Sequence, residues 1–177
     1  MPYSGQTFSN PATGEIVEFL ETSNESAGQR VRFKTTIPQG KGFEVEHFHE
    51  IADESFEVLS GTLSWKLNGK AGKTPAGASI TLPRHQPHAH WNADEEPLVM
   101  IQTISPCYDT DLFLEKLFQL AMDGKLDSKG QPPFLQVMVW LRDLKSRTYL
   151  AAIPKPVQNF LAFLLTPMAK LIGYRAL

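Results

Sequence analysis

The feature that most constrains the fold is a series of short strand-like segments, separated by turn signals, from about residue 16 to residue 105. Several of these segments alternate apolar and polar residues, as strands with one buried and one solvated face do. The dipeptide Asn68-Gly69 follows one of them and is the strongest short signal for a hairpin. Strands are expected over residues 16–22, 29–37, 43–49, 55–59, 62–67, 79–82, 88–92 and 98–104, after 14 loop-like residues. Many short strands at regular spacing are typical of a β-sandwich or barrel.

The pattern changes to a helical one after Pro106. Leucines recur at helical spacing over residues 109–124, and a second apolar helix is expected over residues 134–147. A third apolar stripe follows Pro156, and Pro167 is expected to begin a last helical turn. The chain is therefore expected to combine a β-rich part with a C-terminal helical part.

This change of pattern divides the chain into a β-barrel domain over residues 1–106 and a helical extension over residues 107–177. The extension could pack outside the barrel, cover its mouth or form a dimer interface. The segment 160–165 is apolar on nearly all sides, which is more than one packed face needs. We expect it to be buried against the barrel or a second subunit. We also expect the protein to be a homodimer. Membrane-surface association is not favoured, because few positive charges lie nearby.

The composition excludes several classes of protein. A hydrophobic content of 42% and a charged content of 20% are those of a soluble globular protein. The formal net charge of −2 provides no basic field for nucleic acid. The single cysteine, Cys107, cannot form an internal disulfide, and the N-terminal residues do not resemble a signal peptide. These observations predict a cytoplasmic protein.

Two histidines separated by one residue, His47 and His49, lie in one of the expected strands. Side chains two residues apart on a strand point to the same face. Phe43 and Val45 share this phase, so the histidines are expected to point toward the apolar interior.

Glu54 stands at the head of the expected strand 55–59, and His88 begins the expected strand 88–92. Donors on adjacent strands, about 4.8 Å apart, are within reach of a shared ion about 2 Å from each ligand atom. The sequence therefore predicts that His47, His49, Glu54 and His88 bind one divalent transition metal, which is Fe, Mn, Ni, Cu or Zn. The alternative is that these are ordinary surface histidines.

The spacing of these residues resembles the first of the two motifs of the cupin family. That motif contains His-x-His, three or four residues, Glu, six residues and Gly. Here four residues separate His49 from Glu54, and six residues separate Glu54 from Gly61. This chain departs from the motif only at the opening glycine, whose position is occupied by Lys41.

The second cupin motif follows in the correct order. The family pattern is Gly, five residues, Pro-x-Gly, two residues, His, three residues and Asn, and the chain matches it at Gly77, Pro83, His88 and Asn92. The remaining glycine is replaced by His85, which must avoid or tolerate a positive φ. His85 could carry protons to the cavity or be a solvated loop residue.

The resemblance covers roughly residues 31–104 and implies a mainly β fold, a double-stranded β-helix or jelly-roll barrel. It also implies a metal in the mouth of the barrel, held by His47, His49, Glu54 and His88.

Two residues are candidates for catalysis. Glu54 could move to accept a substrate proton. His90 lies two residues after His88, so it is also expected to point inward. It could act as a general base or alternate ligand, or it could be a core histidine bonded to a neighbour. Glu57 has the opposite phase from Glu54 and is expected to be solvated.

Three functions remain open at this point. A metal with open coordination positions supports a small-molecule oxidoreductase, and the resemblance implies a quercetinase-like dioxygenase. The first alternative is a non-catalytic module that senses or carries a small ligand in the barrel, since fold does not decide function. The second is an isomerase, which would need a further polar cluster in the pocket.

Overall fold

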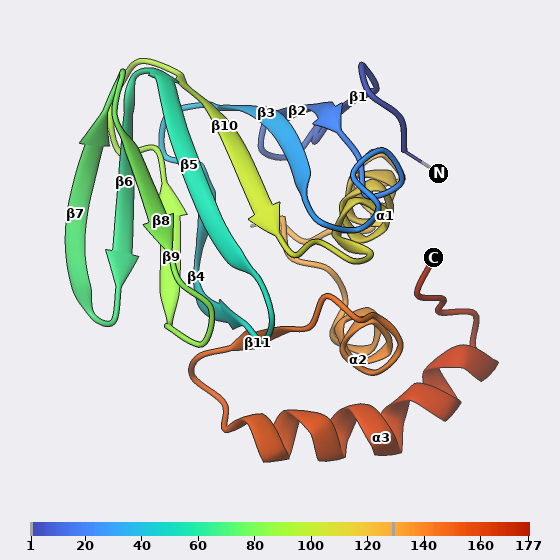
Figure 1. Cartoon of the computed structure of the whole chain (residues 1–177). Helices are drawn as coiled ribbons and strands as arrows, with labels where there is room; N and C mark the ends of the chain where they lie inside the picture. The colour runs from blue at the N-terminus through green and yellow to red at the C-terminus, as the bar shows by residue number, and fades with distance from the viewer. Residues whose placement is uncertain (1, 129) are drawn as a thin grey trace.

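The computed structural model describes residues 2–128 and 130–177. Two antiparallel sheets face each other, and three helices lie beside them (Figure 1). One sheet has the strand order β1 (Thr7–Ser9), β2 (Ile16–Glu21), β3 (Val31–Ile37), β10 (Leu98–Ser105), β5 (Asp53–Ser60) and β8 (Ser79–Leu82). The other has the order β11 (Thr148–Leu150), β4 (Gly42–His49), β9 (His88–Trp91), β6 (Thr62–Leu67) and β7 (Lys70–Pro75). The mainly β, jelly-roll fold expected from the sequence is therefore confirmed.

The strands form where the sequence alternates. In β3 and β10 every second side chain is buried, and the two strands pair with each other in the larger sheet. Residues Asn68 and Gly69 connect β6 to β7, with φ angles of 49° and 77°. Two positive φ angles match the type I′ turn for which asparagine and glycine are suited. The predicted hairpin is confirmed.

Two expectations for the β domain are wrong. The first 14 residues are not entirely loop, because β1 pairs with β2. In β4, Val45 is 37% exposed, although it was expected to share the inward face with His47. The pairing of β4 with β9 shifts register between Phe43 and His47, so the two-residue period does not hold across this segment.

The helices are α1 (Thr110–Met122), α2 (Phe134–Asp143) and α3 (Lys155–Leu171). The second helix, expected over residues 134–147, ends earlier because the chain next joins a sheet as β11, which pairs with β4. The Asp109 carboxylate accepts hydrogen bonds of 2.8 Å from the backbone N–H groups of Lys145 and Ser146. This contact fixes the chain between α2 and β11 against the start of α1.

The expectation that Pro167 begins a separate helical turn is also wrong, because α3 continues through it. A proline within a helix leaves the carbonyl of the residue four positions earlier without its usual donor. That residue is Phe163, and its carbonyl accepts a hydrogen bond from the Arg142 guanidinium of α2. The packing of α2 on α3 thus compensates for the missing N–H group.

One side of α3 packs on the rest of the protein, and the other does not. Ala162, Thr166 and Ala169 are buried, whereas Phe160 is 63% exposed and Leu171 is 88% exposed. Helix α3 lies at the edge of the molecule, beyond α2 (Figure 1). Within the described residues, no helix has the length and apolar character needed to cross a membrane.

Candidate metal centre

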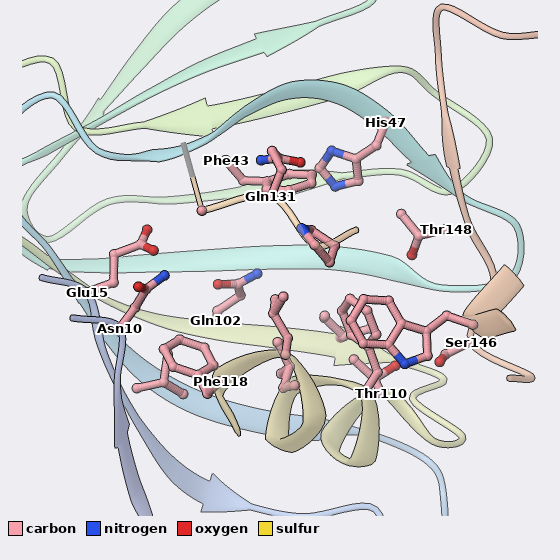
Figure 2. Close-up of a pocket in the computed structure, with 18 of the residues that line it drawn as sticks. Asn10, Glu15, Phe43, His47, Gln102, Thr110, Phe118, Gln131, Ser146 and Thr148 are labelled. Atoms are coloured by element: carbon pink, nitrogen blue, oxygen red, sulfur yellow. The ribbon is translucent and has the colours of Figure 1, made fainter. Parts of the chain in front are cut away.

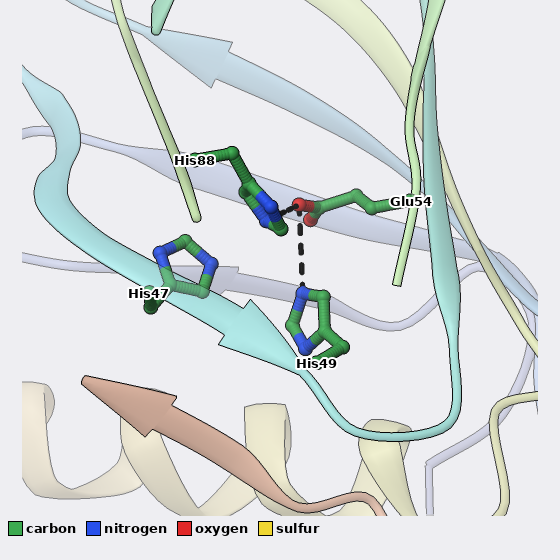
Figure 3. A group of neighbouring side chains, drawn as sticks. All are labelled: His47, His49, Glu54 and His88. Atoms are coloured by element: carbon green, nitrogen blue, oxygen red, sulfur yellow. Dashed lines mark ion pairs between the residues drawn. The ribbon is translucent and has the colours of Figure 1, made fainter. Parts of the chain in front are cut away.

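The four side chains singled out by the motifs converge inside the fold. His47 and His49 come from β4, Glu54 from β5 and His88 from β9. One ligand atom from each residue lies within 4.8 Å of the others. Figure 3 shows the Glu54 carboxylate facing the rings of His88 and His49, with Oε2–Nε2 distances of 3.1 Å and 3.6 Å. His47, His88 and Glu54 are at most 3% exposed.

Backbone carbonyls orient two of the imidazole rings. The Nδ1 atom of His47 lies 2.9 Å from the carbonyl oxygen of Val45, and that of His88 lies 2.8 Å from the carbonyl oxygen of Gln86. Because a carbonyl oxygen only accepts, Nδ1 must carry the proton in both rings. A neutral ring then presents the lone pair of Nε2 to the centre, as metal-binding histidines do.

The third ring is oriented by a residue of the extension. The Nδ1 atom of His49 lies 3.0 Å from the Thr148 hydroxyl, and the residues pair across β4 and β11. A hydroxyl can accept the Nδ1 proton, which again leaves Nε2 facing Glu54. The unexpected strand β11 thus supports the site directly.

Three buried atoms at the centre lack a hydrogen-bond partner among the described residues: Oε2 of Glu54 and the Nε2 atoms of His49 and His88. The other carboxylate oxygen of Glu54, Oε1, accepts a hydrogen bond from the Gln102 amide. Buried polar atoms normally have partners, and a set of converging lone pairs is satisfied by a cation. The donor set of three imidazoles and one carboxylate therefore fits a divalent transition metal.

The electrostatics favour a charged pair within this group. Burial alone would raise the pKa of Glu54, but the rings of His49 and His88 outweigh it and hold that pKa well below its usual value. Burial likewise opposes the charged form of His88, but the Glu54 carboxylate raises the pKa of His88 above its usual value. Burial and the neighbouring His49 hold the pKa of His47 well below its usual value. His47 is therefore neutral, the form that binds metals.

His90 points into the barrel, as expected, but does not belong to the four-residue group. Its ring lies 4.8 Å from that of Phe56 between centroids, and its buried Nδ1 atom has no hydrogen-bond partner among the described residues. Burial lowers the pKa of His90. Glu57 is exposed on the opposite face, in agreement with its phase.

The second motif includes the turn that precedes β9 and Asn92, which directly follows β9. His85 adopts the positive φ of the glycine that it replaces, at 63°, and is exposed. Its backbone N–H donates to the carbonyl of His49 over 2.9 Å, which links the turn to the end of β4. His85 does not line the cavity, so the structure favours a solvated loop residue. Asn92 is buried at the end of β9 and donates to the carbonyls of Ile37 and Glu96.

The group opens into a cavity of about 400 Å³, which is shown in Figure 2. His47, His49, Glu54 and His90 line it, together with residues of both sheets. Its remaining wall is formed by α1, α2, the segment leading to β11, the loop between β1 and β2, and residues 130–132 before α2. Two of the three helices of the extension therefore cover the mouth of the barrel.

Two supporting residues were not predicted. Gln102 was detectable in principle, because it is the one polar side chain among the buried positions Leu98, Met100, Gln102 and Ile104 of β10. Thr148 was not, because its role depends on β11, whose partner lies about a hundred residues earlier in the chain.

Residues 33–104 match the family described as the Cupin domain. No curated protein shows detectable similarity to the chain. Among solved structures, KdgF from Halomonas sp. is 19% identical, with a TM-score of 0.48, over 55% of this chain and 84% of that one. A predicted oxalate decarboxylase from Thermotoga maritima is 19% identical, with a TM-score of 0.49, over 58% of this chain and 91% of that one.

A sugar phosphate isomerase of the cupin superfamily from Silicibacter pomeroyi is 16% identical, with a TM-score of 0.48, over 59% of this chain and 75% of that one. Identities this low do not indicate a shared reaction. The family match covers both motifs, from β3 to β10. Residues 33–104 are therefore a cupin domain.

Proposed function

We propose that this cupin is a metal-dependent oxidoreductase that acts on a small molecule, in the manner of a quercetinase-like dioxygenase. His47, His49, Glu54 and His88 would hold one divalent transition metal. The observation that carries the proposal is the group of buried atoms without partners, Oε2 of Glu54 and Nε2 of His49 and His88, facing one another beside a cavity.

The residues around the centre have distinct roles in this proposal. A bound metal with open coordination positions would supply Lewis acidity and, if redox-active, electron transfer to O₂. Gln102 fixes one oxygen of Glu54 by its hydrogen bond and leaves the other free to bind the metal or to take a substrate proton. His90 is close enough to the group to line the same cavity, and its free Nδ1 atom can accept a hydrogen bond or a proton from a ligand.

A non-catalytic ligand-binding module is the second candidate. The cavity itself favours it, because a site covered by helices can hold a small molecule without turning it over. The isomerase alternative finds less support, because most of the cavity wall is apolar rather than built to hold a polyhydroxylated substrate.

Oxygen uptake separates these candidates. The protein, loaded in turn with Fe, Mn, Ni, Cu or Zn, is supplied with small aromatic hydroxyl compounds and diketones in an oxygen-electrode cell. The dioxygenase proposal predicts turnover with at least one redox-active metal. His88→Gln should lose it, and His85→Gln should retain it as the matched control, because His85 is exposed and outside the cavity. If no metal supported oxygen consumption, the non-catalytic ligand-binding module would be the remaining candidate.

The remaining expectations from the sequence are proposals of the same kind. The lone cysteine, Cys107, is buried without a disulfide, which is compatible with a reducing cytoplasm. The net charge of −2 supports the absence of a nucleic-acid partner. The exposed apolar side of α3 supports a homodimer.

A further inference from the structure

The helical extension supplies much of the cavity wall. Phe113, Leu117 and Phe118 come from α1, and Trp140 and Leu141 come from α2. All five lie outside the segment that matches the Cupin domain family. The wall that α1 and α2 supply therefore comes from a portion of the chain outside the family match, and these five residues are apolar, three of them aromatic.

The charges in the wall restrict what can enter. Among the described residues that line the cavity there is no lysine or arginine, whereas there are two carboxylates, Glu15 and Glu54. A phosphate or carboxylate on the body of a ligand would lose its hydration there without a cationic side chain to replace it. The wall thus disfavours anionic ligands such as sugar phosphates and suits an uncharged molecule.

A few polar atoms in the wall could orient such a molecule. Thr35, Ser146 and His90 line the cavity, and their Oγ1, Oγ and Nδ1 atoms are buried without a partner in the described part of the chain. A buried donor or acceptor that lacks a partner costs free energy, and a hydroxyl or carbonyl group on a ligand would remove that cost. The pattern fits an apolar body with one or two oxygen functions.

We infer that the cavity binds an uncharged, largely aromatic or alicyclic small molecule bearing a hydroxyl or carbonyl oxygen, and that α1 and α2 determine its specificity. A cavity of about 400 Å³ lies within the range of ordinary small-molecule sites. The inference rests on the proposed function only for the orientation of the ligand, whose hydroxyl or carbonyl oxygen would face the four-residue centre. Binding of the apolar body needs no metal.

Isothermal titration calorimetry tests the inference on the full chain, with and without metal. The probes are 2-naphthol, 2-naphthyl phosphate and glucose 6-phosphate. Ala121→Phe fills the cavity from α1, and Val137→Phe fills it from α2. Met122→Phe is the matched control, because Met122 is exposed and does not line the cavity. Circular dichroism and metal content are measured for each variant, so that loss of fold or of the metal centre is seen separately.

The inference predicts that 2-naphthol binds, with or without metal, and that both phosphates bind at least about tenfold more weakly. Both cavity-filling variants should weaken 2-naphthol binding by about tenfold or more while keeping their fold and metal content, because the added ring occupies the ligand's volume. Met122→Phe should bind as the natural chain does. Absence of 2-naphthol binding, equal or tighter binding of either phosphate, or wild-type binding by both folded filling variants would overturn it. A protein that binds 2-naphthol but no metal would refute the proposed function and leave this inference standing.

Discussion

The replacement Gln102→Leu is expected to weaken both the fold and the metal centre. Glu54 is 2% exposed, and the hydrogen bond to its Oε1 atom comes from the Gln102 amide. Leucine has a similar volume, so the main change is the loss of this donor. A hydrogen bond to a charged group contributes about 1.5–3 kcal/mol, so the free energy of unfolding of the metal-free protein should fall by about that amount. Mutation of a residue that orients a metal ligand typically lowers the affinity for the metal by about 10- to 100-fold, and we expect a decrease in this range for Gln102→Leu.

Urea denaturation of the metal-free protein measures the first effect, and competition with a chromophoric chelator measures the second. Thr35→Val is the matched control, because it removes a buried hydroxyl that has no partner in the described structure. This replacement should lower the free energy of unfolding by less than about 1 kcal/mol and leave the metal affinity unchanged. If Gln102→Leu matched the natural chain in both assays, the hydrogen bond to Glu54 would not have the role assigned to it.

Three further outcomes are expected. His85→Gly should stabilise the protein by about 0.5–1 kcal/mol in urea denaturation, because glycine adopts a positive φ without strain; a loss of stability would contradict this. Metal affinity should rise with pH through the raised pKa of His88 and level off above it, since the metal replaces a proton at Nε2. Calorimetric titration in buffers of different ionisation enthalpy would measure the protons released on metal binding. An affinity independent of pH would argue against binding through His88. Sedimentation should show that the natural chain is a homodimer. The double replacement Phe160→Ser and Leu164→Ser should convert it to monomers, because both side chains are more than half exposed on α3. A natural chain that sediments as a monomer would contradict the homodimer expectation.

The sequence was most informative where local periodicity and turn chemistry determine the outcome. Alternating burial in β3 and β10, and the turn at Asn68-Gly69, follow directly from the residues present. The spacing of the two motifs also identified four side chains that the structure brings within 4.8 Å. These features depend on which residues neighbour one another along short strands.

The features that the sequence did not reveal depend on contacts between distant segments. Strand β11 exists because residues after α2 pair with the edge of β4, and the role of Thr148 depends on that pairing. The continuity of α3 through Pro167 depends on a donor from α2, Arg142. Val45 is exposed because the pairing of β4 with β9 shifts register nearby. A local pattern contains no information about these partners.

The central claim is that His47, His49, Glu54 and His88 hold a single metal ion. Elemental analysis of protein purified without added metal, compared with the His88→Gln variant, tests it most directly. The account predicts close to one equivalent of a transition metal per chain in the natural protein and much less in the variant, whose circular dichroism should remain that of a folded β protein. A natural protein without transition metal that also fails to take up Fe, Mn, Ni, Cu or Zn on addition would contradict it, as would an unchanged metal content in the variant.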